Sequence, residues 1–170
     1  MEKNEAYSKA LRRINACIAR KTTKLDLSSL GLGEIPLEIG KCLWITHLDL
    51  EYNFIDRIRG IDNLVNLTEI NLNNNFITDI VRINNLVALQ KLDLSHNKIS
   101  HLGGLEKLKN LKELNLRGNE ISIIEGLTSL SSLHTLHLSE NIISEIDGLM
   151  SLVSLKTLYL WGNKIIEVGI

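Results

Sequence analysis

Aromatic residues and proline are scarce in this chain of 170 residues, which holds two Phe, two Trp, three Tyr and one Pro. Neither sign of charge is in excess, because 19 Lys and Arg face 20 Asp and Glu. The chain therefore lacks the basic field that nucleic-acid-binding proteins usually carry. Cys17 and Cys42 stand in no metal-ligand spacing and are too few for a disulfide scaffold. These absences argue against a nucleic-acid binder, a zinc module and a disulfide-rich secreted domain.

Long hydrophobic runs and catalytic motifs are missing too. The sequence has no apolar run of about 18 residues and no signal peptide, so we expect a cytoplasmic protein that does not enter a membrane. It contains no Walker loop, no HExxH and no GxSxG, and Gly31-x-Gly33 lacks the third glycine of a dinucleotide loop. The five histidines are scattered and form no ligand cluster. The chain is therefore predicted not to be an enzyme and to need no cofactor or metal.

Leucine and isoleucine, in contrast, are abundant, with 32 Leu and 22 Ile. They recur in a frame of 22 residues, Leu/Ile-x-x-Leu/Ile-x-Leu-x-x-Asn-x-Ile-x-x-Ile/Leu/Val, whose asparagines are Asn53, Asn75, Asn97, Asn119, Asn141 and Asn163. An earlier copy has Leu30 in the asparagine position and is one residue longer. The last copy is incomplete. The array of about seven copies covers residues 24–170.

Each copy predicts a short strand, because x-Leu-x-Leu-x alternates with a period of two. The asparagine amide has both a donor and an acceptor, so stacked copies can bond the turn of the neighbouring repeat. After the turn, apolar residues at about every third position predict 3₁₀ pieces. Glycines mark the bend before that segment in most copies, whereas Arg82 stands there in the third; the glycines are Gly60, Gly104, Gly126 and Gly148.

The frame is that of the leucine-rich repeat, and the chain is identified as a member of that family. Its fold class is α/β: a right-handed solenoid of strands and 3₁₀ segments with a parallel concave sheet. The repeat length and the Gly-Leu pair resemble the class found in the regulatory subunit of protein phosphatase 1 and an axonemal dynein light chain. Bacterial internalins share the length but usually have Pro-Leu there and are secreted, and neither feature is expected of this chain. Residues 10–39 resemble the start of leucine-rich repeat domains in bacterial Roco-type GTPases.

The two ends of the array differ. Residues 1–23 are predicted to form a capping helix over the first repeat, because Tyr7, Leu11, Ile14 and Ile18 recur at helical spacing, with Ala10 and Cys17 beside them. Cys17 is expected to fill the core beside them, and the basic opposite face to be solvated rather than bound to lipid or nucleic acid. No cap follows the last copy. Its leucines are expected to be under-covered and its edge strand open to self-association, or to a partner or further chain.

The concave sheet is the predicted binding surface, since a solenoid offers no deep pocket. Its outward columns are acidic in the first half and aromatic at the end, which favours a basic or amphipathic segment of a protein partner. The candidate residues are Asp49, Glu51, Glu69, Asp93, Arg117, His137, Tyr159 and Trp161. The neighbouring Asp26 and Asp49 are expected to raise one carboxyl pKa or hold a cation, or else to be ordinary solvated repeat residues.

A second candidate patch stands directly after the asparagine position of the repeat. Phe54 and Phe76 stand directly after the asparagine in adjacent copies, with Tyr52 close by. They are expected either to form an exposed aromatic patch or to fold back over Ile55 and Ile77. The sequence thus predicts a protein-interaction scaffold or adaptor. The alternatives are the recognition domain of a larger signalling protein such as a Roco-type GTPase, or a phosphatase regulator.

Overall fold

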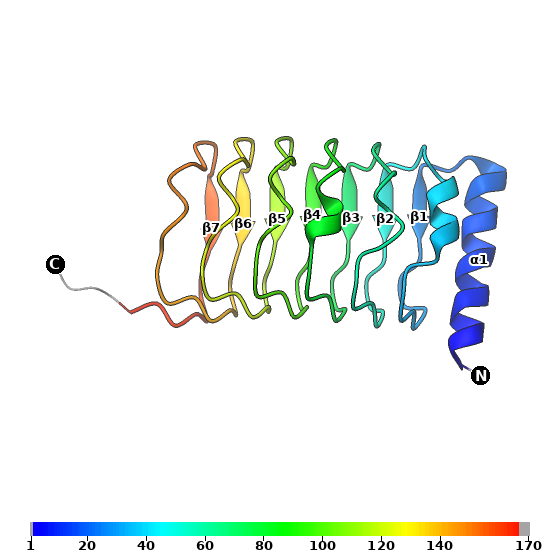
Figure 1. Ribbon diagram of the computed structural model, residues 1–170, viewed down its shortest axis with the longest axis horizontal. Coiled ribbons are helices and arrows are strands. Elements are labelled where there is room, and N and C mark those ends of the chain that lie inside the picture. The colour runs from blue at the N-terminus through cyan, green and yellow to red at the C-terminus, as the bar shows by residue number, and fades with distance from the viewer. Residues whose placement is uncertain (1, 167–170) are drawn as a thin grey trace.

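The computed structural model describes residues 2–166, which form one helix followed by a solenoid of parallel strands (Figure 1). Helix α1 (Glu2–Arg20) lies across the first coil, and each later coil adds one strand to a seven-stranded sheet in sequence order. The strands are β1 (Lys24–Asp26), β2 (His47–Asp49), β3 (Glu69–Asn71), β4 (Lys91–Asp93), β5 (Glu113–Asn115), β6 (Thr135–His137) and β7 (Thr157–Tyr159). The predicted solenoid with a capping helix is confirmed.

The strand register follows the repeat without a slip. Leu25 pairs with Leu48, and Leu136 with Leu158, so the central strand residue of every coil points into one continuous core. That core consists almost entirely of Leu and Ile side chains (44% of the chain is hydrophobic). Because each coil contacts only its neighbours, the molecule is extended and its core is a row of identical layers.

The asparagines form a buried ladder between coils. In the coil of Asn97, its Nδ2 donates to the carbonyls of Leu72 (2.9 Å) and Leu94 (3.1 Å), while its Oδ1 accepts the N–H of Ile77 (2.9 Å). Asn97 is only 7% exposed. The first coil, with Leu30 in the asparagine position, still receives this support: Asn53 Oδ1 accepts the N–H groups of Leu30 and Leu32.

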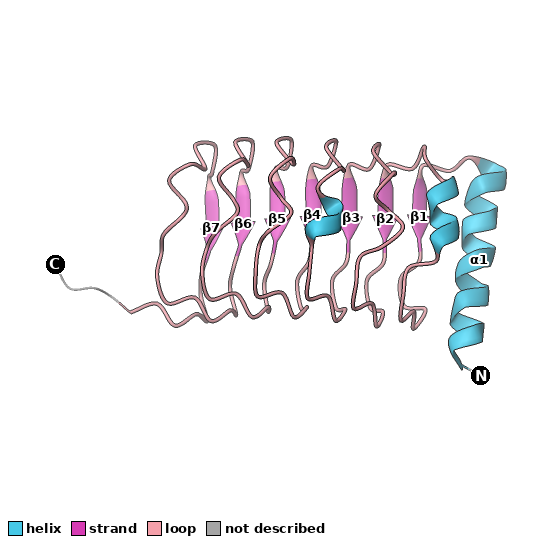
Figure 2. Ribbon diagram, viewed as in Figure 1, coloured by secondary structure: helices cyan, strands magenta, loops and turns pink. Residues whose placement is uncertain are grey.

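The convex side consists mostly of turns, with 3₁₀ helices only at η1 (Leu37–Lys41) and η2 (Val81–Ile83) in the described chain (Figure 2). These are the coils in which Leu37 and Arg82 replace the bend glycine. Elsewhere the glycine has a positive φ and lies against the previous coil: a Cβ on Gly126 would be 2.6 Å from the carbonyl oxygen of Leu102. Glycine thus allows both the turn and the close stacking, and a coil without it makes a helical turn instead.

The capping helix buries one stripe of side chains against the first coil. Ala6, Ala10, Ile14 and Cys17 are buried, whereas Tyr7, Leu11 and Ile18 lie half-buried at its borders. The stripe is therefore centred one position away from the predicted Tyr7–Leu11–Ile14–Ile18 line. Residue Cys17 is a core residue, as expected. The pKa of the neighbouring Cys42 thiol is raised to about 11 by burial and by Cys17, so it is a poor nucleophile.

The last coil is under-covered, as its position predicts. Leu158, Leu160 and Ile165 are half-buried, whereas their counterparts in the preceding coil are fully buried. The incomplete end at residues 168–170 lies outside the described residues. Within residues 2–166, no helix is both long and apolar enough to cross a bilayer.

The ladder leads to a first prediction. Replacing Asn97 with Ala leaves the Ile77 N–H without its buried acceptor and removes one of the two asparagine donors from each of the Leu72 and Leu94 carbonyls, and should cost ~1–3 kcal/mol of unfolding free energy. Asn163→Ala should cost less, because Asn163 is half-exposed and supports the last coil. Urea denaturation measures both.

Asn85→Ala is the matched control for that prediction. Asn85 is exposed and makes no hydrogen bond in the described structure, so its loss should leave the midpoint unchanged. Equal midpoints for Asn97→Ala and Asn85→Ala would contradict the role of the ladder.

Candidate functional site

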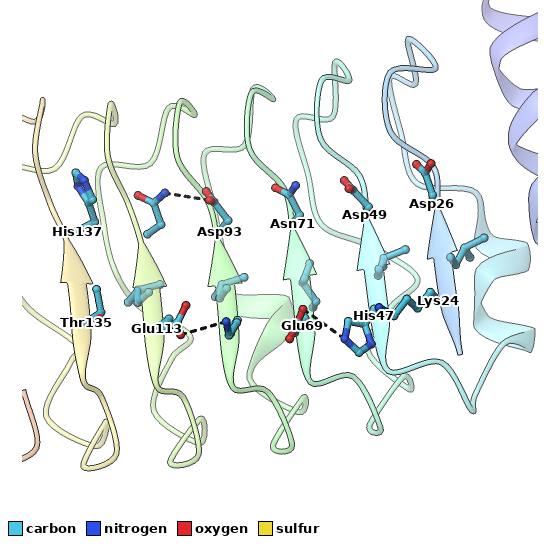
Figure 3. Close-up of a pocket in the computed structure, with 17 residues that line it drawn as sticks. Lys24, Asp26, His47, Asp49, Glu69, Asn71, Asp93, Glu113, Thr135 and His137 are labelled. Carbon is cyan, nitrogen blue, oxygen red and sulfur yellow. Dashed lines mark hydrogen bonds and ion pairs between the residues drawn. The ribbon is translucent and has the colours of Figure 1, made fainter. Parts of the chain in front are cut away.

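The concave face is a shallow groove that encloses about 690 Å³ and runs from β1 to β6 (Figure 3). Its floor is built by the two outward residues of each strand, which form two rows along the sheet. The first row runs Lys24, His47, Glu69, Lys91, Glu113, Thr135 and Thr157. The second row runs Asp26, Asp49, Asn71, Asp93, Asn115, His137 and Tyr159. A third column, two residues beyond the second row, includes Glu51, Arg117 and Trp161.

The acids of the first row contact basic side chains on neighbouring strands. His47 Nε2 lies 3.4 Å from a carboxylate oxygen of Glu69, and Lys91 Nζ lies 3.2 Å from one of Glu113 (Figure 3). Neighbouring strands therefore carry opposite or complementary groups at this level. Glu69, a predicted partner-binding residue, belongs to this row, and its carboxylate already has a contact within the chain.

The second row keeps its negative charge. Each Asp or Asn in it uses Oδ1 to accept the backbone N–H two residues later, as in Asp49 with Glu51 (3.0 Å) and Asp93 with Ser95 (2.9 Å). These side chains therefore shape the turn as well as the surface. The second carboxylate oxygen of Asp93 accepts a hydrogen bond from Asn115 Nδ2 at 3.0 Å. After the adjacent pair Asp26 and Asp49, Asn and Asp alternate, so Asn71 separates Asp49 from Asp93.

The two acids at the start of the row differ in environment. Burial raises the pKa of the Asp49 carboxyl, and the nearby Glu51 and Asp26 charges add to the rise. At Asp26, burial also acts to raise the pKa, but hydrogen bonds from Ser28 and the charge of Arg13 outweigh it and lower the pKa. Of the two carboxyls, Asp49 thus has a raised pKa, which is one of the outcomes expected for this pair. No cluster of three or more metal-ligating side chains occurs within residues 2–166.

The last strands carry an organised group of aromatic and charged side chains. Arg117 donates to both carboxylate oxygens of Glu140, at 3.0 and 2.8 Å, and its guanidinium lies 4.9 Å from the centre of the Trp161 ring. The His137 and Tyr159 rings stack with centroids 4.6 Å apart. Trp161 is 53% exposed and Tyr159 43%. We name these five residues the aromatic end of the groove.

The charges of the aromatic end are held in place by their contacts. The hydrogen bonds from Arg117 lower the pKa of the Glu140 carboxyl, and the pKa of Arg117 is correspondingly raised. Burial, together with the Arg117 charge, lowers the pKa of His137. His137 is therefore neutral near pH 7, and the net charge of the Arg117–Glu140 pair is zero.

Two residues of the site were not predicted from the sequence. Arg13 was assigned to the solvated face of the capping helix, but it bonds the backbone carbonyl (3.0 Å) and carboxylate (3.2 Å) of Asp26. Glu140 lies one position before a ladder asparagine, outside the three columns. Its position beside Arg117 follows from the lateral offset of neighbouring coils, which is set by packing between coils and not by the repeat spacing.

The second candidate patch is present on the edge of the solenoid formed by the turns after the strands. The Phe54 and Phe76 rings stack with centroids 6.0 Å apart and planes 12° from parallel. Phe54 is 59% exposed, Phe76 45% and Tyr52 57%, so the rings are exposed rather than folded into the core over Ile55 and Ile77. The patch is separate from the aromatic end of the groove.

The chain belongs to the leucine-rich repeat family. A family model for two consecutive leucine-rich repeats matches residues 44–87, 87–129 and 131–168. No curated protein sequence matches the chain.

Solved structures of Listeria monocytogenes proteins share the fold. An internalin (inlF) is 24% identical over 92% of this chain and 56% of its own, with a TM-score of 0.67, and internalin C2 is 28% identical over 86% and 74%, also at 0.67. The functional domain of InlJ is 26% identical over 86% of this chain and 34% of its own, at 0.68. The chain thus spans about half the length of the first of these and a third of the last. InlJ includes a cysteine ladder, whereas this chain has asparagine in its ladder and two cysteines in all.

The raised pKa of Asp49 leads to a second prediction. Asp49→Asn should raise the melting temperature at pH 7, because the charged form of Asp49 is less favourable in the folded than in the unfolded chain. Asn can keep the turn, as Asn71 and Asn115 do in the same row. The gain should be at most about 2 °C, since a half-exposed carboxylate is screened by water. It should vanish at a pH below the unfolded pKa of aspartate, where the carboxyl is protonated in both states.

Asn71→Asp is the reverse control. It places another carboxylate beside Glu51, whose carboxylate accepts the Asn71 Nδ2 at 2.9 Å, and should lower the melting temperature at pH 7 but not in acid. A gain for Asp49→Asn that is equal at pH 3 and pH 7 would assign the effect to hydrogen bonding instead of charge. Differential scanning calorimetry across that pH range measures both.

Proposed function

We propose that the protein is a non-enzymatic interaction module that holds a basic or amphipathic segment of a protein partner along its concave face. The observation that carries this proposal is the arrangement of the aromatic end. Trp, Tyr and Arg are the residue types that dominate binding energy at protein interfaces. Here Trp161 and Tyr159 are exposed and Arg117 is half-buried, and all three are already ordered by stacking and by the Arg117–Glu140 pair. Little side-chain entropy remains to be lost when a partner binds.

The charge of the groove supports a basic segment. Glu113 is paired with Lys91 and Glu69 contacts His47, so the carboxylates without a basic contact among the described residues lie along the second row and third column at Asp49, Glu51 and Asp93. A cationic segment would be drawn to that line and would end against the Trp161 and Tyr159 rings. The near-zero net charge of the whole chain and the acidic groove disfavour nucleic acid as the partner.

The setting of the module is part of the proposal. A cytoplasmic protein of the scaffold or adaptor kind is consistent with two buried, unpaired thiols. Residues 10–39 favour the recognition domain of a larger signalling protein, such as a Roco-type GTPase, as the second candidate. The phosphatase-regulator alternative rests on acidic and aromatic concave residues, namely Asp49, Glu51, Glu69, Tyr159 and Trp161. The half-covered last coil offers a route to self-association.

Binding kinetics test the concave face. A partner captured by cross-linking to the full chain should associate more slowly with Glu51→Gln/Asp93→Asn, and its association should depend less on salt, because these carboxylates steer the encounter. Trp161→Ala should instead speed dissociation by about tenfold or more, because the ring is a contact in the complex. Surface plasmon resonance at two salt concentrations separates the two effects.

Glu145→Gln provides the matched control for charge, because Glu145 is exposed and lies off the concave face. It should change neither rate. A partner whose two rates are the same with wild-type protein and with all the concave variants would contradict the proposal.

A further inference from the structure

The edge of the solenoid formed by the turns after the strands contains a groove. It lies between the first half of α1 and the aromatic patch of Phe54 and Phe76. It encloses about 720 Å³. Two smaller hollows continue from it along the helix, and Asp56 lines all three. The groove does not open onto the concave sheet. Its walls are Glu5, Ala6 and Lys9 of α1 on one side and Phe54, Phe76 and Asp56 on the other, with Leu30, Gly31 and Gly33 between them.

One repeat position explains why the groove is there. The residue directly after the asparagine position is Gly31, Phe54, Phe76 and Lys98 in the first four coils. Phe76 is covered on one side by Phe54 and on the other by the ammonium of Lys98, 5.0 Å from its centre. Phe54 has Gly31 on its outer side, where no side chain covers the ring. One aromatic face therefore remains open toward the helix.

The main chain of the groove is also open. Gly31 and Gly33 have no side chains, and a Cβ at Gly33 would meet no atom within 4 Å. The N–H groups of Gly31, Gly33 and Glu34 donate no hydrogen bond within residues 2–166. Another polypeptide backbone can therefore approach closely and find donors that are ready to pair.

Two acids, Glu34 and Asp56, lie beside the open ring, and Arg57 and Arg59 line a neighbouring hollow. Glu34 and Asp56 are exposed and form no ion pair with any side chain that the structure describes, whereas the Lys9 ammonium is held by Glu5 at 2.7 Å. An aromatic face next to free carboxylates attracts a guanidinium or an ammonium, and Lys98 on Phe76 shows the same kind of contact within the chain.

We infer that this groove binds an extended segment of a partner protein that carries an apolar or aromatic residue beside an arginine or lysine. The apolar side chain packs over Gly31 against the uncovered part of the Phe54 ring, the cation lies over the ring edge against Asp56 and Glu34, and the backbone pairs with the Gly31–Glu34 amides. This second surface is distinct from the concave face. One partner can therefore occupy both surfaces, or two different partners can occupy one each.

A peptide probe tests the inference on the full chain. The probe is acetyl-Phe-Arg-Phe-Arg-amide, and its neutral control has citrulline in place of each arginine. In ¹⁵N–¹H correlation spectra the arginine peptide should shift the amides of Gly31, Gly33, Phe54 and Asp56. Asp56→Asn should weaken its affinity by about threefold, and citrulline by a similar factor.

The ring contacts need their own variant. Phe54→Ser/Phe76→Ser should weaken the same peptide by about tenfold. This change also removes the stacking of the two rings, so the folding of the double variant has to be checked. Unchanged chemical shifts of the glycine and asparagine amides in its last coils serve as that check. Glu145→Gln, an exposed acid at the other end of the molecule, should leave the affinity unchanged.

Three outcomes would overturn the inference: no shift at the Gly31 and Gly33 amides, shifts confined to concave-face amides such as those of Asn71 and Asn115, or equal affinity for the arginine and citrulline peptides. A fourth concerns the occupant. If the free wild-type chain dimerises in sedimentation velocity and the double variant does not, the patch serves a second copy of this chain rather than a peptide segment.

Discussion

The buried asparagine amide is the interaction on which the rest of the structure depends. A turn after a three-residue strand leaves backbone donors and acceptors inside the molecule, where each unpaired group is costly. One asparagine satisfies groups in its own coil and in the preceding coil at once, as Asn97 does for Leu94, Leu72 and Ile77. The leucine layers can stack at a constant spacing only because this bond repeats at a constant spacing.

That constraint gives the two ends of the solenoid different characters. At the start, the position without asparagine is supported by Asn53 of the next coil, and α1 covers the exposed layer with small residues such as Ala6 and Ala10. Small side chains let the helix approach the sheet closely, and they also leave room beside Gly31. The small side chains that let the helix close the core thus also leave space for the groove next to Phe54.

Register converts sequence columns into surfaces. Since identical positions lie side by side on adjacent strands, a charge in one repeat always faces the same position of the next. His47 contacts Glu69 and Lys91 pairs with Glu113 in one row, and Asn71 separates Asp49 from Asp93 in the other. The groove is therefore less acidic than its composition indicates, and its polarity runs along one line toward the rings of β6 and β7.

The sequence by itself determined the fold, because a 22-residue spacing with a period-two strand allows one stacking arrangement. It also determined which residues share a column, and hence that Phe54 and Phe76 are neighbours. Only the tertiary structure decided which columns exchange contacts. Arg13 reaches Asp26 from the helix, and Arg117 bonds Glu140 across two columns, because the helix angle and the lateral offset of successive turns set those distances. Neither quantity is encoded in the spacing of one repeat, since both arise from packing between coils.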